Sequence, residues 1–271
     1  MLKKLYKHEW RSFFFVPTLT IIIFAVISIL LDISIFTPIW DDENPFFVLF
    51  DVMFVLAYYF SIIAVVLVPQ IISVIRFYKN LFTDEGYLMF TLPVKTSDLL
   101  NAKLLVSFTW QLISYATVSI SVGALGIVLV NRFSDSVYEF FEEFFEVFRE
   151  LGDIIVEELG IPVWSFVLWL ILLVIVSNLL NILYLYTCIC LGQLFQKHKI
   201  GGAIGVYIGL NAVTQFVSRL VTLPIMMMEE VDITPGLIVG LGLLTLMLFI
   251  GICIGMYFLC NHIMKTKLNL E

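Results

Sequence analysis

Charged residues are scarce in this chain, and long stretches have none. Asp, Glu, Lys and Arg make up 14% of the 271 residues, whereas hydrophobic residues make up 61% and the mean hydropathy is +1.04. A soluble domain is nearer half apolar. The composition therefore excludes an ordinary soluble domain and indicates an integral membrane protein.

The usual signatures of nucleotide and metal chemistry are also missing. No G-x-x-x-x-G-K-[ST] sequence occurs, so the chain has no P-loop to hold phosphates. Only three histidines are present and none belongs to an H-E-x-x-H pair, so we expect neither a metal site nor a catalytic centre. The four cysteines all lie in apolar runs, where they are expected to be small core residues.

Six segments lack Lys, Arg, Asp and Glu for long enough to cross a bilayer, which takes about 20 helical residues. They are too long and too uniformly apolar for the strands of a membrane barrel. The sequence therefore predicts an all-α, polytopic membrane protein with six transmembrane helices. The segments are Phe13–Leu31, Val52–Ile75, Leu104–Asn131, Gly160–Gln196, Ile200–Ser218 and Ile233–Asn261.

The distribution of Lys and Arg predicts how the helices are oriented. Twelve of the fifteen cations fall on one side of the predicted topology, which the positive-inside rule makes cytoplasmic. Both termini are then cytoplasmic, in agreement with an even number of crossings. The twelve are Lys3, Lys4, Lys7, Arg11, Arg76, Lys79, Lys95, Lys103, Lys197, Lys199, Lys265 and Lys267.

Residues 134–159 form a different kind of segment between the third and fourth crossings. Phe and other apolar residues recur with helical periodicity and alternate with carboxylates, which predicts an extracellular amphipathic helix. Ser136 and Glu139 have the spacing of a capping box at its start. The Phe side packs on a neighbouring helix or rests at the interface, or else the helix contacts a cationic or amphipathic substrate. The carboxylates for that contact are Glu142, Glu143, Glu146 and Glu150.

Polar side chains inside the predicted spans are costly in lipid and therefore informative. Asn178 and Asn181 share one helix face, and Asn211, Gln215 and Arg219 follow each other at four-residue spacing. They either form hydrogen bonds between helices or line a substrate path or a protomer seam. The spans carry no ladder of carboxylates, which argues against a proton-driven carrier.

Glycines also repeat at four-residue spacing in the last two spans. Small residues let helix backbones approach closely in a membrane, so the pattern predicts tight packing within the bundle or between protomers. The glycines are Gly201, Gly205 and Gly209, then Gly236 with Gly240, and Gly251 with Gly255.

A polar interlude separates the second and third spans on the predicted cytoplasmic side. Gly86 permits a left-handed turn, Pro93 ends any helix that precedes it, and Thr96 or Ser97 can cap the next helix. An apolar cluster between them is expected to be exposed to the cytosol, and such clusters mark docking surfaces. The cluster consists of Tyr87, Leu88, Met89 and Phe90.

The sequences KHEWR, before the first span, and RFYKNLFTDEGYLMFTLPVKTSDLLNAKLL together resemble permease subunits of ABC transporters of the type-two exporter class, of Firmicutes type. The resemblance implies a cytoplasmic connecting helix in residues 1–12 and a coupling element in residues 78–100. Within this element, Asp84 and Glu85 would face basic residues of a separate ATPase subunit. Gly86, Pro93 and the four apolar residues would complete the docking surface.

The resemblance further implies two ATPase subunits, which bind ATP and Mg²⁺, and a second permease chain, identical or different. This chain would then be no enzyme, would hold no cofactor, would bind no nucleic acid, and would lie in the bacterial cytoplasmic membrane. Efflux of antimicrobial peptides or amphiphiles is the favoured output. A non-ABC secondary carrier or channel is the alternative, and an embedded enzyme or anchor is a third interpretation.

Overall fold

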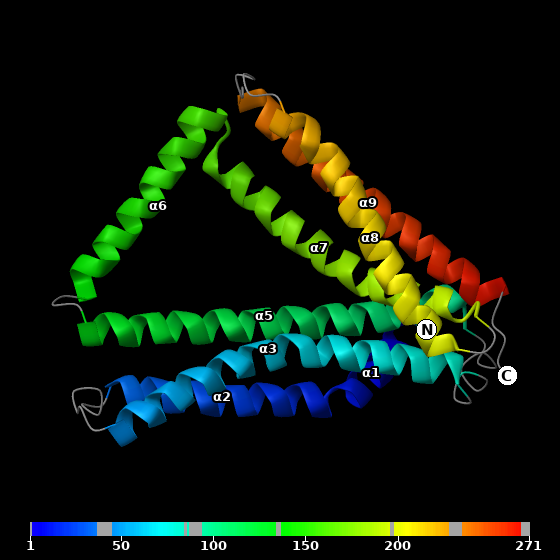
Figure 1. Ribbon diagram of the computed structural model, residues 1–271, viewed down its shortest axis with the longest axis horizontal. Helices are drawn as coiled ribbons and strands as arrows, with labels where there is room; N and C mark the ends of the chain where they lie inside the picture. The colour runs from blue at the N-terminus through cyan, green and yellow to red at the C-terminus, as the bar shows by residue number, and fades with distance from the viewer. Residues whose placement is uncertain are drawn as a thin grey trace. The chain divides into compact units, whose positions relative to one another are not determined.

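The computed structural model describes residues 2–36, 45–83, 86, 94–133, 137–195, 198–227 and 235–266. The described residues form eight helices and no strand (Figure 1). The helices are α1 (Leu2–Phe13), α2 (Phe15–Phe36), α3 (Pro45–Phe82), α5 (Thr96–Phe133), α6 (Val137–Leu159), α7 (Val163–Gly192), α8 (Lys199–Met227) and α9 (Pro235–Thr266).

Among the residues that the structure describes, five helices are long and apolar enough to cross a membrane, as in a multi-pass membrane protein. They coincide with five of the six predicted spans and are α2, α3, α5, α7 and α9. The sixth predicted span, Ile200–Ser218, lies in α8, which is 29 residues long but is not among the five. Whether α8 crosses the membrane therefore stays a prediction.

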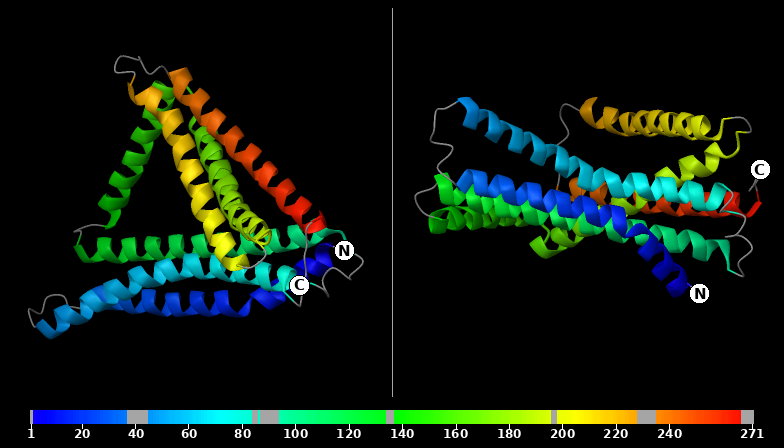
Figure 2. Two further views of the ribbon diagram at one scale, coloured as in Figure 1. Left: turned by 45° about the vertical axis from the view of Figure 1, so that its right-hand side comes forward. Right: turned by 90° about the horizontal axis from the view of Figure 1, so that it is seen from below.

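The chain divides into two compact units, and each is described by itself. The N-terminal unit contains Leu2–Ser73 and Leu105–Leu151. Its first helix, α1, leaves the line of α2 near Phe14 (Figure 2), and Trp10 of α1 stacks on Trp110 of α5 at 5.1 Å. Phe24 and Leu31 of α2 and Val65 of α3 form a buried cluster between the long helices.

The C-terminal unit contains Val74–Leu104 and Gly152–Glu271. In it, α7 packs against both α8 and α9. At the corner between α7 and α8, a Cβ added to Gly192 would lie 2.6 Å from the backbone nitrogen of Ala203, so only glycine permits this close approach. All four cysteines are buried and free, as predicted for core residues.

The corner between α6 and α7 is tightly built. Gly160 has a φ of 64°, the left-handed conformation that glycine adopts at little cost. Pro162, two residues later, provides the N-cap position of α7. A Cβ on Gly152 would touch the Val163 side chain at 3.4 Å, so the last two turns of α6 lie close to the start of α7.

Two local expectations differ from the structure. Gly86 is helical and its N–H donates to the Thr83 carbonyl at 2.7 Å; among the described residues, the left-handed glycine is Gly160 instead. Thr96 begins α5 as expected, but its hydroxyl donates to Asn261 Oδ1 of α9 at 3.2 Å. The proposed capping box of α6 involves Ser136, which lies outside the described residues.

Candidate functional site

Seven of the eight docking residues predicted within the coupling element lie outside the described residues. This is the case for Asp84, Glu85, Tyr87, Leu88, Met89, Phe90 and Pro93, whereas Gly86 is described and buried. The structure does describe the two helix ends that bound this element, the end of α3 and the start of α5. Both belong to the C-terminal unit. Their packing determines where a force applied to the element would go.

The end of α3 is embedded in apolar contacts. Phe77 and Leu81 are fully buried, and the Phe77 ring stacks on Tyr186 of α7 with centroids 3.9 Å apart and planes 6° from parallel. Such a pair is worth about 0.5–1.5 kcal/mol beyond the buried area. The end of α3, which leads into the predicted coupling element, is therefore fixed to α7.

The start of α5 is held in the same unit, by a different helix. Leu100 is fully buried, and Leu99 and Ala102 beside it are nearly so. The Thr96 hydroxyl reaches Asn261 near the end of α9. The exit from the coupling element is therefore joined to α9, as its entry is joined to α7.

The predicted intramembrane polar residues do not form one cluster. Asn178 is only 4% exposed, and neither polar atom of its amide has a hydrogen-bond partner in the described structure. Asn181 and Asn211 are half-buried, whereas Gln215 and Arg219 of α8 are exposed. For Asn178, the expected hydrogen bond between helices is absent from the described structure.

The glycine stripes of α8 and α9 are open. A Cβ added to most of these glycines would meet nothing within 4 Å among the described residues, so the tight packing predicted for the stripes is not made within this chain there. Packing between protomers stays a prediction. The open positions are Gly205, Gly209, Gly236, Gly240, Gly251 and Gly255.

Helix α6 carries both exposed rings and exposed carboxylates. Every side chain from Phe140 to Leu151 is exposed, and the rings of Phe144 and Phe148 lie 4.7 Å apart along the helix. A surface hollow of about 450 Å³ contains two of the four predicted contact carboxylates, Glu142 and Glu146. Glu143 and Glu150 are not among its lining residues, which are Tyr138, Phe141, Glu142, Phe145, Glu146 and Arg149.

The charge of the chain is concentrated in α6. Its residues Val137–Leu159 contain eight carboxylates and one arginine, whereas the rest of the chain contains fourteen acidic and fourteen basic residues. The formal net charge of −7 therefore resides on this one helix. A charge of that density attracts cations to α6.

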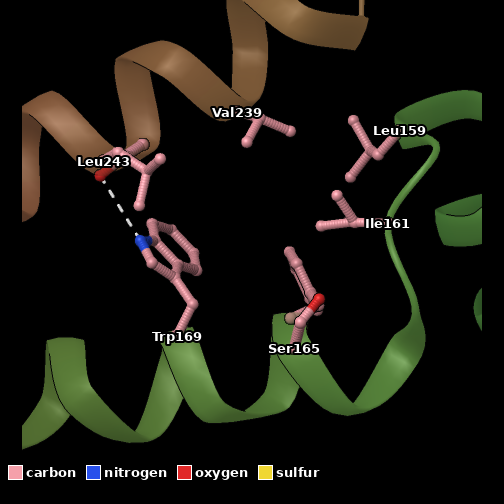
Figure 3. A pocket seen from close by; sticks show the side chains of 8 residues that line it. Leu159, Ile161, Ser165, Trp169, Val239 and Leu243 are labelled. Carbon is pink, nitrogen blue, oxygen red and sulfur yellow. Dashed lines mark hydrogen bonds between the residues drawn. The ribbon is translucent and has the colours of Figure 1, made fainter.

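A second cavity, of about 250 Å³, lies where α6 meets α7 and α9 (Figure 3). Trp169 rises from α7, and its Nε1–H donates to the Gly242 carbonyl of α9 at 3.3 Å. Leu159 and Ile161 close the opposite side. Sequence reasoning missed this cavity because its residues come from three separate segments.

Chemistry at a metal centre has no basis in the described residues. No group of three or more His, Cys, Asp or Glu side chains in that part of the chain is placed to hold a metal ion. What the structure does show is an all-helical membrane protein with an exposed acidic helix and an apolar cavity beside its end. Comparison of the chain with family models, curated proteins and solved structures finds no match.

Proposed function

We propose that the chain is the transmembrane permease subunit of an ATP-driven ABC exporter of the type-two class, in the bacterial cytoplasmic membrane. It would pair with a second permease chain and dock two ATPase subunits. In this topology α8 is the sixth crossing, and both termini are cytoplasmic. The observation that supports the proposal best is the anchoring of both ends of the coupling element to the membrane helices α7 and α9.

This anchoring suits the transmission of force. A displacement of residues 83–95 is passed to α7 through the Phe77–Tyr186 stack and to α9 through Thr96 and Asn261. Packed rings transmit displacement because protein interiors are dense and deform little. ATP binding would bias the equilibrium only if the closed ATPase pair contacts one conformation more favourably than the other.

The unpaired amide of Asn178 supports a second conformation. A buried polar group without a partner costs about 1–3 kcal/mol. A permease alternates between two arrangements, and a group unpaired in one can be paired in the other or on the substrate path. The open glycine stripes of α8 and α9 are the surfaces that a second permease chain would cover.

The test is co-purification from the native host. The tagged chain, extracted in mild detergent, should carry an ABC ATPase identified by mass spectrometry, together with Mg²⁺-dependent ATP hydrolysis. Leu88→Asp and Phe90→Asp should abolish both, because each places a charge in the apolar docking surface. Leu88→Met and Phe90→Leu are the matched controls and should retain both activities.

Two results would reject the proposal. One is a purified chain that transports its substrate with no ATPase present, which would favour a channel or secondary carrier. The other is an exterior location of residue 88, shown by labelling a Leu88→Cys variant in intact cells with an impermeant maleimide.

Cationic amphiphiles or antimicrobial peptides are the substrate class that the exposed rings and carboxylates of α6 favour. Replacing Glu142, Glu143, Glu146 and Glu150 together with Gln should lower resistance of the host to cationic peptides. Unchanged resistance would exclude these four carboxylates from substrate contact.

A further inference from the structure

We propose that the cavity between the end of α6, α7 and α9 is a binding site for a small cationic amphiphile, with its hydrocarbon tail inside and its charged head at the last turn of α6. Its role as a substrate site rests on the export function proposed above. Binding of such a molecule in the cavity does not depend on that function.

The side chains that line the cavity are almost entirely apolar. Only two side chains in it carry polar atoms, and both are already bonded within the protein: Ser165 Oγ donates to the Pro162 carbonyl at 2.7 Å, and Trp169 Nε1–H donates to Gly242. The remaining contacts come from Leu159, Ile161, Phe166, Val239 and Leu243. A ligand part that needs hydrogen bonds would lose them here, so a hydrocarbon tail fits best.

The size is sufficient for a tail. Dry apolar cavities of roughly 150 Å³ already bind benzene, and this one measures about 250 Å³. The cavity lies near the N-terminal ends of α7 and α9, beside the turn that contains Gly160 and Pro162. A tail can therefore enter while its head stays at the end of α6.

Charge selects a cationic head. Glu157 and Glu158 directly precede Leu159, which lines the cavity, and Asp153 lies one turn earlier. The last turn of α6 contains no basic residue. The carbonyl end of a helix is already partly negative, so carboxylates there are unfavourable for the chain alone and favour a bound cation.

The experiment measures binding to the chain alone, reconstituted in phosphatidylcholine nanodiscs. The probe is 12-bromododecyltrimethylammonium, whose bromine quenches tryptophan fluorescence on contact. Dodecyl probes with the same bromine and either a sulfate or a maltoside head provide the anionic and uncharged arms. We expect saturable quenching by the cationic probe, its loss in Trp169→Phe, and weaker binding of the other two probes.

Two sets of variants distinguish the contribution of the hydrocarbon tail to binding from that of the charged head. Val239→Phe and Leu243→Phe each fill the cavity and should abolish the saturable quenching. Glu157→Gln combined with Glu158→Gln should weaken the cationic probe by about tenfold, as expected for the loss of two partly exposed charge pairs, and leave the uncharged probe unchanged. Glu139→Gln with Glu271→Gln removes the same charge outside the last turn of α6 and should change nothing.

The inference fails if the uncharged probe binds as tightly as the cationic one, which would mark a site for a neutral lipid tail. It also fails if no probe shows a saturable component that depends on Trp169. If a filled variant does not fold, the two glutamine pairs still decide the question. Absence of a co-purifying ATPase would reject the export function and leave this binding result standing.

Discussion

The two units join their helices with different chemistry. In the N-terminal unit, Ser121 of α5 bonds to Ser28 of α2 at 2.6 Å and to Tyr58 of α3 at 3.0 Å, so one hydroxyl cluster joins three helices. Two more side-chain hydrogen bonds join helices of this unit, Ser34 to Asp51 and Ser73 to Ser107, at 2.6 Å each. The C-terminal unit also has hydrogen bonds between helices, such as Thr96 with Asn261 and Trp169 with Gly242, but it adds a near-parallel ring stack, buried thiols and a close glycine approach.

The difference teaches how helices can associate where lipid provides no hydrophobic drive. Hydrogen bonds between membrane helices are worth about 0.6 kcal/mol each, so several are needed to fix one interface. Shape complementarity between rings and small residues can fix an interface with fewer groups, because each close contact involves many atoms. The predicted coupling element is attached to the C-terminal unit.

The largest expected effect is in the C-terminal unit. Phe77→Ala removes the fully buried ring that stacks on Tyr186 and should lower the free energy of unfolding by about 3–5 kcal/mol. Thermal unfolding of the purified protein in detergent measures this. The control is Phe60→Ala, whose side chain is 63% exposed and should matter little. Equal losses in the two variants would contradict the packing described for α3 and α7.

A smaller effect is expected in the N-terminal unit. Ser121→Ala removes both bonds of the hydroxyl cluster and should cost about 1 kcal/mol, since each bond contributes little on its own. Ser177→Ala is the matched control, because that hydroxyl bonds only to the Val174 carbonyl of its own helix. A loss for Ser121→Ala as large as that for Phe77→Ala would overturn the contrast between the units.

The smallest effect has the opposite sign. Asn178 is a buried, unpaired amide in the C-terminal unit, and Asn178→Leu should raise the stability by about 1 kcal/mol because that amide is removed. Transport should fall if the amide is needed in a second conformation. Asn181→Leu, at a half-buried position, should change the stability less. A destabilised Asn178→Leu protein would show that the amide is paired.

The positions of the spans were predictable because they depend on composition. Five predicted segments fall within apolar helices, but the helices run further, as α3 does from Pro45 to Phe82. The absence of charge marks only the apolar part of a helix, whereas α3 itself continues past Arg76 and Lys79. The amphipathic helix 134–159 was predicted for the same reason and is found as Val137–Leu159.

The pairings between helices were not predictable. Nothing in the sequence places Phe77 against Tyr186, Thr96 against Asn261 or Trp169 against Gly242, since each pair is separated by more than 70 residues. Thr96 shows the difficulty, because a hydroxyl at the start of a helix can either cap that helix or bond to another helix, and the sequence does not say which. Its actual partner depended on which helix end lay nearby.

The sequence by itself determined that the chain is helical, that it belongs in a membrane, and that its net charge sits on one outer helix. These properties follow from hydropathy and periodicity, which act residue by residue. Only the tertiary structure decided which polar groups are paired, where a cavity remains, and which helices hold the ends of the coupling element. Those outcomes depend on contacts between distant segments, and local composition does not encode such contacts.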